Sequence, residues 1–149
     1  MKVKLKMSMV KGEINRCKKR FLKSTAPAAY KEICEKLDVV PIFINRSRGR
    51  NPLYAQAWCV SQSLRWYLGH EPIKIGRRYY FMIIEINRYY EHNYFTLKTL
   101  IGHEMGHLMQ IIVDKEVDGQ YNLANPKKDH GPKWQKLSSW FGGNIVAEW

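Results

Sequence analysis

The sequence contains 149 residues, with 25 lysines and arginines against 13 aspartates and glutamates, which gives a formal net charge of +12. A chain of this length with 45% hydrophobic residues can bury one core, so we expect a single domain. It has no apolar run near the roughly 18 residues of a membrane-spanning helix, and no apolar signal segment follows its basic N-terminus. We therefore expect an intracellular protein without a membrane partner, whose three cysteines are reduced thiols.

The first part of the chain contains helix-like patterns and then strand-like ones. Apolar residues at helical spacing predict an amphipathic helix over residues 10–23, and Pro27 is suited to begin a second helix. Residues 1–38 are thus expected to form a basic helical N-terminal part, and residues 39–149 the core. Apolar and β-branched runs, with Gly69 and Gly76 as breaks, predict strands over residues 39–45, 55–60, 64–68 and 79–87.

A further helix is predicted over residues 95–113, where apolar residues recur near helical spacing and Asn93 suits the N-cap position. This helix contains the pattern H-E-x-x-H, formed by His103, Glu104 and His107. Histidines four residues apart lie on one face of a helix, where both can bind a single zinc ion. Glu104 lies about 100° further round the helix, beside the metal, where it can act as a base towards water. The pattern therefore predicts two zinc ligands and a catalytic glutamate.

Two glycines, Gly102 and Gly106, flank the first histidine of this pattern. Each weakens the intrinsic helix propensity by up to about 1 kcal/mol relative to alanine. Their lack of side chains would let a strand or a substrate backbone approach the metal-bearing face, or would only relieve crowding against a neighbouring element. The sequence favours neither interpretation.

The pattern still needs a third metal ligand, and His130 is the preferred candidate. It stands directly before Pro132, which is suited to begin a helix that Gly142 and Gly143 would end after residue 141. A histidine at a helix start has a well-defined direction, and three histidines form an established type of catalytic zinc site. The alternatives are Glu116 and Asp118, because carboxylates also complete zinc sites. We expect one zinc ion per chain, with the polar segment 114–129 connecting its two helices.

These elements predict an α+β fold, in which a small and mostly antiparallel sheet packs against the helices. The zinc helix lies against the sheet, and the third ligand comes from the start of a C-terminal helix.

The segments His103-Glu104-Met105-Gly106-His107 and His130-Gly131-Pro132-Lys133-Trp134 together resemble the SprT-like domain, the zinc metalloprotease domain of Spartan-type proteins. The resemblance extends over roughly residues 39–140 and is specific around the two histidine clusters. It implies a small α+β metalloprotease fold with zinc on three histidines, and in Spartan-type members DNA-dependent cleavage of proteins attached to DNA. Many SprT-like proteins carry a cysteine zinc ribbon, but this sequence has no C-x-x-C pair. Any DNA targeting is therefore expected to come from this domain or from a partner.

The positive charge favours a polyanionic partner, and DNA, single-stranded or duplex, is the expected one. Nine Lys or Arg residues and one acid, Glu13, lie within the first 23 residues. Other basic residues stand in a polar loop or next to tyrosines, where they could hold phosphates: Arg46, Arg48, Arg50, Lys74, Arg77 and Arg78. A solvated basic surface without a partner is the alternative.

Together the patterns predict a zinc-dependent metalloprotease that hydrolyses DNA-associated or DNA-crosslinked proteins. One alternative is a regulatory metalloprotease that cleaves a repressor; that group resembles this chain around residues 103–108 but not around residues 130–134. The other is a basic DNA-binding protein with a structural metal. Closed structural zinc sites usually have four protein ligands, whereas only three are evident here.

Overall fold

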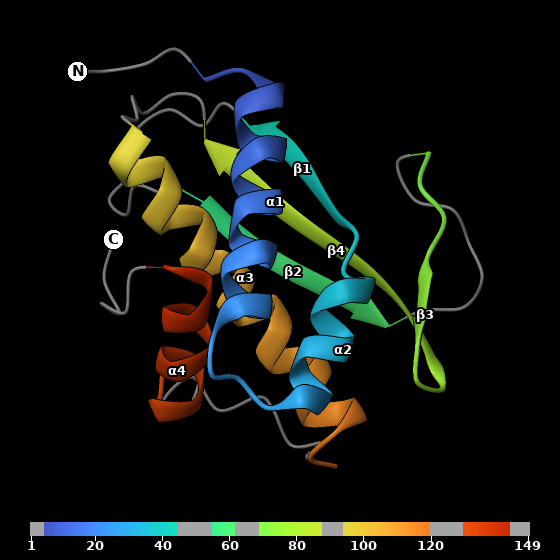
Figure 1. Ribbon diagram of the computed structural model, residues 1–149. Helices are drawn as coiled ribbons and strands as arrows, with labels where there is room; N and C mark the ends of the chain where they lie inside the picture. Colours follow the sequence, from blue (N-terminus) through green and yellow to red (C-terminus); the bar gives the residue numbers. More distant parts are fainter. Residues whose placement is uncertain (1–4, 45–54, 62–68, 88–93, 120–129, 144–149) are drawn as a thin grey trace.

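The computed structural model describes residues 5–44, 55–61, 69–87, 94–119 and 130–143. The described helices are α1 (Met7–Lys23), α2 (Ala28–Lys36), α3 (Tyr94–Glu116) and α4 (Pro132–Phe141). The described strands are β1 (Val39–Ile44), β2 (Ala55–Ser61), β3 (Ile73–Ile75) and β4 (Arg78–Asn87). Figure 1 shows the helices gathered in front of the strands. The α+β class expected from the sequence is therefore confirmed.

The sheet is mixed, with the long strand β4 at its centre. β4 pairs in parallel with β1 on one side and antiparallel with β2 on the other, and β3 adds a short antiparallel pairing. The prediction of a mostly antiparallel sheet missed the parallel pair. β1 and β4 are far apart in the sequence, so the intervening chain lets β4 return in the direction of β1, as parallel neighbours require.

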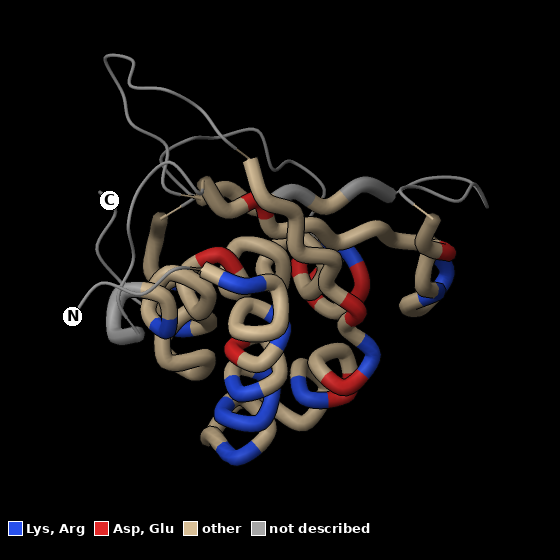
Figure 2. The backbone as a smooth tube through the Cα atoms, turned by 90° about the horizontal axis from the view of Figure 1, so that it is seen from above, with Lys and Arg blue, Asp and Glu red and all other residues tan. Residues whose placement is uncertain are grey.

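β4 is buried along most of its length and forms the floor of the core. Alternate side chains point to one face of a strand, and Tyr80, Met82, Ile84 and Ile86 join the main cluster of buried residues. The same cluster takes in apolar residues of all four described helices. In Figures 1 and 2 the helices lie on one side of the sheet, which is the face that this cluster fills.

α1 and α2 agree with the sequence patterns and place the N-terminal part on the core. The apolar stripe predicted for the first helix is buried, with Val10, Cys17 and Phe21 fully inaccessible. The helix begins at Met7, earlier than predicted, and α2 follows Pro27, which stands at its N-cap.

Two further differences concern element boundaries. The strand predicted over residues 64–68 lies outside the described residues. β3 was not predicted, because a run of only three residues carries little alternation; Gly76, with φ +63°, forms the turn that joins it to β4.

α3 continues through residues 114–116, which had been assigned to a polar loop. These residues remain helical because their charges are neutralised by other elements. Asp114 is buried and forms an ion pair with Lys133 of α4, while Glu116 forms one with Arg78 of β4. Charged residues at a helix end are thus compatible with packing when tertiary partners exist.

Among the described segments, no helix combines the length and the apolar character that crossing a lipid bilayer would need.

Candidate metal centre

Three histidines from two elements converge on one point. His103 and His107 come from the middle of α3, and His130 lies just before α4. Nε2 of His107 lies 3.3 Å from Nε2 of His103 and 3.2 Å from Nε2 of His130. The candidate ligand atoms all lie within 4.8 Å of one another. Nitrogens that surround zinc tetrahedrally at about 2.0–2.1 Å are about 3.3 Å apart, so the three rings fit one such ion.

The sequence alternatives for the third ligand are used elsewhere. Glu116 accepts hydrogen bonds from Arg78 at 2.9 Å and from the Tyr80 hydroxyl at 2.5 Å. Asp118 accepts hydrogen bonds from the Tyr30 hydroxyl at 2.8 Å and from Lys133 at 2.5 Å. Neither carboxylate belongs to the histidine group, so His130 is the residue that the fold brings to the site.

Small residues allow the close contact between α3 and α4 that brings His130 to the metal helix. A Cβ atom on Gly106 would lie 3.0 Å from the Cα of Ser138, and one on Gly102 would overlap the backbone of Gly143. The neighbouring element is therefore α4 with the residues that follow it. Of the two interpretations of these glycines, the structure supports the relief of crowding against a neighbouring element.

Trp134 contacts all three histidines, a structural role that the sequence analysis did not assign to it although it belongs to the second motif. Its side chain is fully buried, and its Nε1–H donates a hydrogen bond to the backbone oxygen of His103 at 3.2 Å. Its ring stacks on His107 with an interplanar angle of 19° and meets His103 and His130 edge-on. The only sequence signal for this role was an aromatic residue one helical turn after His130.

Glu104 is buried between α3 and the sheet. Glu104 is only 5% exposed. Burial raises the pKa of its carboxyl to about 8, although a hydrogen bond from the backbone N–H of Ala57 acts in the opposite direction. Ala57 lies in β2, so the carboxylate reaches the edge of the sheet. A divalent cation at the three histidines would lower this pKa, because it favours the nearby negative charge.

The electrostatics of the site favour neutral imidazoles. Burial, together with the neighbouring His103 and His130, lowers the pKa of His107 to about 3. Neutral imidazole is the form that binds metal, so this ligand needs no deprotonation at neutral pH. The three histidines can therefore hold one divalent metal ion.

Three of the six residues predicted to contact nucleic acid lie in the described part of the chain. Arg46, Arg48 and Arg50 lie outside the described residues. Lys74 and Arg77 are exposed near the β3–β4 turn, with the Lys74 amine 5.9 Å from the centre of the Tyr79 ring. Arg78 forms an ion pair with Glu116.

The cysteines are free thiols, in agreement with the sequence interpretation. Cys17 and Cys34 are buried in the helical core, and Cys59 is partly buried in β2. Burial raises the pKa of each of these thiols to about 12, which leaves them protonated and poorly nucleophilic at neutral pH.

A scan of the chain against models of protein families finds no match, and comparisons with curated proteins and with solved structures find no significantly similar chain. The functional argument therefore depends on the geometry of the site.

Proposed function

We propose that the protein is a zinc-dependent peptidase with Glu104 as its general base. The observation that carries this proposal is a buried glutamate that directly follows the first of three convergent histidines, on the same helix as two of them. Zinc on three protein ligands is typical of catalytic sites, and a glutamate after the first histidine is the usual base of such metalloproteases.

The chain's own residues account for the proton transfers of peptide hydrolysis. A zinc ion held by His103, His107 and His130 supplies Lewis acidity towards the substrate carbonyl and the attacking water. Glu104 accepts a proton from the water as its oxygen bonds to the carbonyl carbon. It then donates this proton to the amine nitrogen when the C–N bond breaks, and is itself ready for the next cycle.

The edge of β2 is the proposed place for the substrate backbone. β2 is hydrogen-bonded to β4 along one side, and its residue Ala57 turns its N–H towards Glu104 on the other. A peptide that adds to this edge as an extended strand would run past the catalytic carboxylate. Recognition through main-chain hydrogen bonds gives little sequence specificity, since side-chain pockets supply most of it.

The substrates are proposed to be proteins attached to or associated with DNA. The net charge of +12 supports a polyanionic partner, and the resemblance to the SprT-like domain around residues 103–107 and 130–134 points to the same class. A protein held on DNA next to the bound peptidase would be cleaved because it is close, without a demanding sequence motif.

Replacement of the general base tests the proposal. Glu104→Gln should retain one zinc per chain and lose cleavage of a DNA-bound protein substrate by at least 100-fold, since the amide cannot accept the proton. Glu32→Gln, an exposed change on α2, is the matched control and should retain activity. His130→Ala should lose zinc, whereas His70→Ala, at an exposed histidine outside the site, should retain it. Full cleavage by Glu104→Gln, or by the wild type after chelation, would overturn the proposal.

A further inference from the structure

α1 presents a cationic surface without an exposed acid. The helix contains six lysines and arginines and a single carboxylate, Glu13, which is buried and ion-paired with Arg16 and Arg20. Four of the basic residues are exposed: Lys11, Arg16, Lys19 and Lys23. Figure 2 shows the basic positions following one another along this helix, at the side of the molecule away from the sheet.

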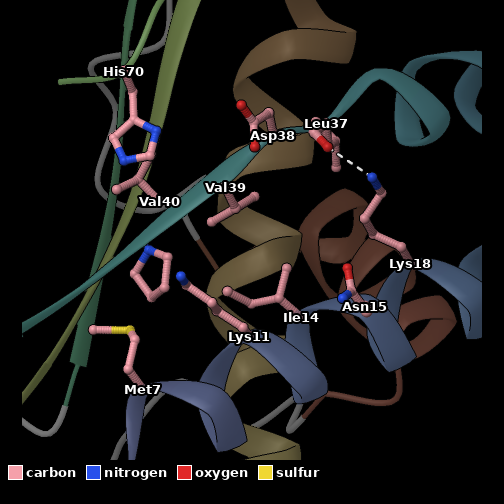
Figure 3. A pocket seen from close by; sticks show the side chains of 11 residues that line it. Met7, Lys11, Ile14, Asn15, Lys18, Leu37, Asp38, Val39, Val40 and His70 are labelled. Atoms are coloured by element: carbon pink, nitrogen blue, oxygen red, sulfur yellow. Dashed lines mark hydrogen bonds between the residues drawn. The ribbon is translucent and has the colours of Figure 1, made fainter. Parts of the chain in front are cut away.

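A pocket opens along one side of this surface, between α1 and the start of β1. Its volume is about 370 Å³, within the range of about 300–1,000 Å³ that small-molecule sites have. Ile14, Leu37 and Val39 supply apolar walls. Figure 3 shows α1 on one side of the pocket, and residues 37–41 with His70 on the other.

Polar groups surround the apolar walls of this pocket. Lys11, Asn15 and Lys18 come from successive turns of α1, and the exposed His70 lines the pocket beside Val40. Lys18 donates a hydrogen bond to the backbone oxygen of Leu37 at 2.7 Å, which ties α1 to the end of α2, just before β1. The only carboxylate that lines the described pocket is Asp38. Apolar walls with cations at the rim suit a ligand that has a flat, weakly polar body and a phosphate.

We propose that α1 and this pocket bind single-stranded nucleic acid. The phosphates lie along the exposed cations, and one unstacked base enters the pocket over Val39, against the imidazole of His70. Lys and Arg neutralise phosphates, while bases of single strands stack on flat side chains and offer their polar edges to groups such as the Asn15 amide. A duplex keeps its bases stacked and paired, so only a single strand can supply the inserted base.

An acidic membrane surface would also attract this helix, but the packing of α1 argues against it. A membrane-surface helix inserts its apolar side into the lipid. The apolar side of α1 is already buried in the core, with Val10, Cys17 and Phe21 inaccessible to solvent. Nucleic acid needs only the exposed cations and the pocket, and it is therefore the partner that we assign to this surface.

This inference rests on the proposed function in one respect: it names the polyanion that brings the peptidase to its substrates. Binding is measurable without hydrolysis, so failure of either proposal can be distinguished from failure of the other. The experiment measures the fluorescence anisotropy of a labelled deoxythymidine oligonucleotide, single-stranded or in a duplex, as protein is added. Vesicles containing 30% phosphatidylserine serve as a competitor. The measurement is made at two salt concentrations and repeated with chelator-treated protein.

The decisive variant is Lys11→Glu with Lys19→Glu, compared with the control Lys36→Glu with Lys136→Glu, which changes the net charge equally on α2 and α4. The α1 variant should lose at least tenfold in affinity for the single strand and show a weaker salt dependence, whereas the control should lose no more than about threefold. His70→Ala should weaken binding of the single strand and leave the duplex unaffected.

Three outcomes would overturn the inference. They are equal losses in the α1 variant and the control, equal affinity for single strand and duplex with no effect of His70→Ala, and displacement of the oligonucleotide by the vesicles at a lower phosphate concentration than by unlabelled oligonucleotide. If the single strand binds as expected but Glu104→Gln retains peptidase activity, the proposed function is wrong and the proposed nucleic-acid surface is still supported.

Discussion

Trp134 and His103 are joined by a hydrogen bond from the indole Nε1–H to the backbone oxygen of the histidine, at 3.2 Å. The bond connects α4 to the metal helix at the first ligand, while the indole plane stacks on the second ligand, His107. One fully buried side chain thus fixes the backbone of one ligand and the ring of another. The candidate metal centre is thus organised by α4 as much as by α3.

Trp134→Phe should weaken metal binding without unfolding the protein. Phenylalanine retains a ring against His107 but removes the N–H, and loss of such a buried hydrogen bond costs about 0.5–1.5 kcal/mol. We expect a loss of unfolding free energy of that size and a loss of zinc affinity of three- to tenfold, measured by competition with a chromophoric chelator. Trp140→Phe, at a half-buried tryptophan that packs on Phe21 and Tyr30, is the control. Equal zinc affinities in the two variants would contradict the role assigned to Trp134.

A second connection between the same helices runs through Lys133. Its ammonium group contacts both Asp114 and Asp118 at the end of α3, and Asp118 also accepts the hydrogen bond of Tyr30 from α2. Because Lys133 stands three residues after His130, this ionic bridge holds the segment that carries the third ligand. We infer that Lys133 is a positioning residue for His130.

Lys133→Met tests this role, with Lys136→Met, an exposed lysine on the same helix, as the control. Removal of the ammonium leaves the buried Asp114 without its partner, which is strongly unfavourable, so stability should fall by about 1–3 kcal/mol. Zinc affinity should fall at least tenfold, and Lys133→Arg should restore part of it. An unchanged zinc affinity in Lys133→Met, with stability lost, would show that the bridge supports only the fold.

The convergence of the three histidines could be predicted from the sequence because two of them follow a local pattern and the third precedes a recognisable helix start. The spacing of His103 and His107 requires only a helix, and the proline after Gly131 marks the start of the helix that follows His130. Trp134 and Lys133 could not be assigned in the same way, since their roles arise from contacts across 31 residues to His103 and 19 residues to Asp114. Long-range pairing likewise decided the parallel β1–β4 register, which alternation within a strand does not specify.

Glu116, the last residue of α3, should make the free energy of unfolding depend on pH in the acid range. Burial alone would raise the pKa of this carboxyl, but hydrogen bonds from Tyr80 and Arg78 outweigh it and lower the pKa below the ordinary value. A depressed folded-state pKa stabilises the protein above the unfolded pKa of about 4.3, and the contribution is lost as the pH falls through the lower folded value.

Glu116→Gln should therefore destabilise the protein at pH 7 by about 1–2 kcal/mol, because the side chain of Glu116 is only 7% exposed and its ion pair is partly shielded from solvent. The difference from wild type should shrink as the pH falls below about 4.3. Urea unfolding at several pH values measures it, with the exposed Glu32→Gln as the control. A difference that stays constant down to pH 3 would refute the assignment of the lowered pKa to Glu116.

Gly102 and Gly12 provide a matched pair of glycines within helices. A Cβ on Gly102 would overlap the backbone of Gly143, so neither residue can move aside by rotating a side chain. A Cβ on Gly12 of α1 would meet only the Arg16 side chain, at 3.7 Å or more. Gly102→Ala should therefore destabilise the protein by about 1–3 kcal/mol through overpacking, and should displace α4 and with it His130.

Gly12→Ala should have the opposite sign, a gain of up to about 1 kcal/mol, because alanine has the higher helix propensity and meets no obstacle. Thermal unfolding of the two variants, with and without added zinc, measures both effects. Zinc raises the stability of any chain that binds it only when folded, so the zinc-induced shift should be smaller in Gly102→Ala than in Gly12→Ala. A Gly102→Ala variant as stable as wild type and with equal zinc affinity would contradict this role. The close backbone contact between α3 and the end of α4 would then not be needed to position His130.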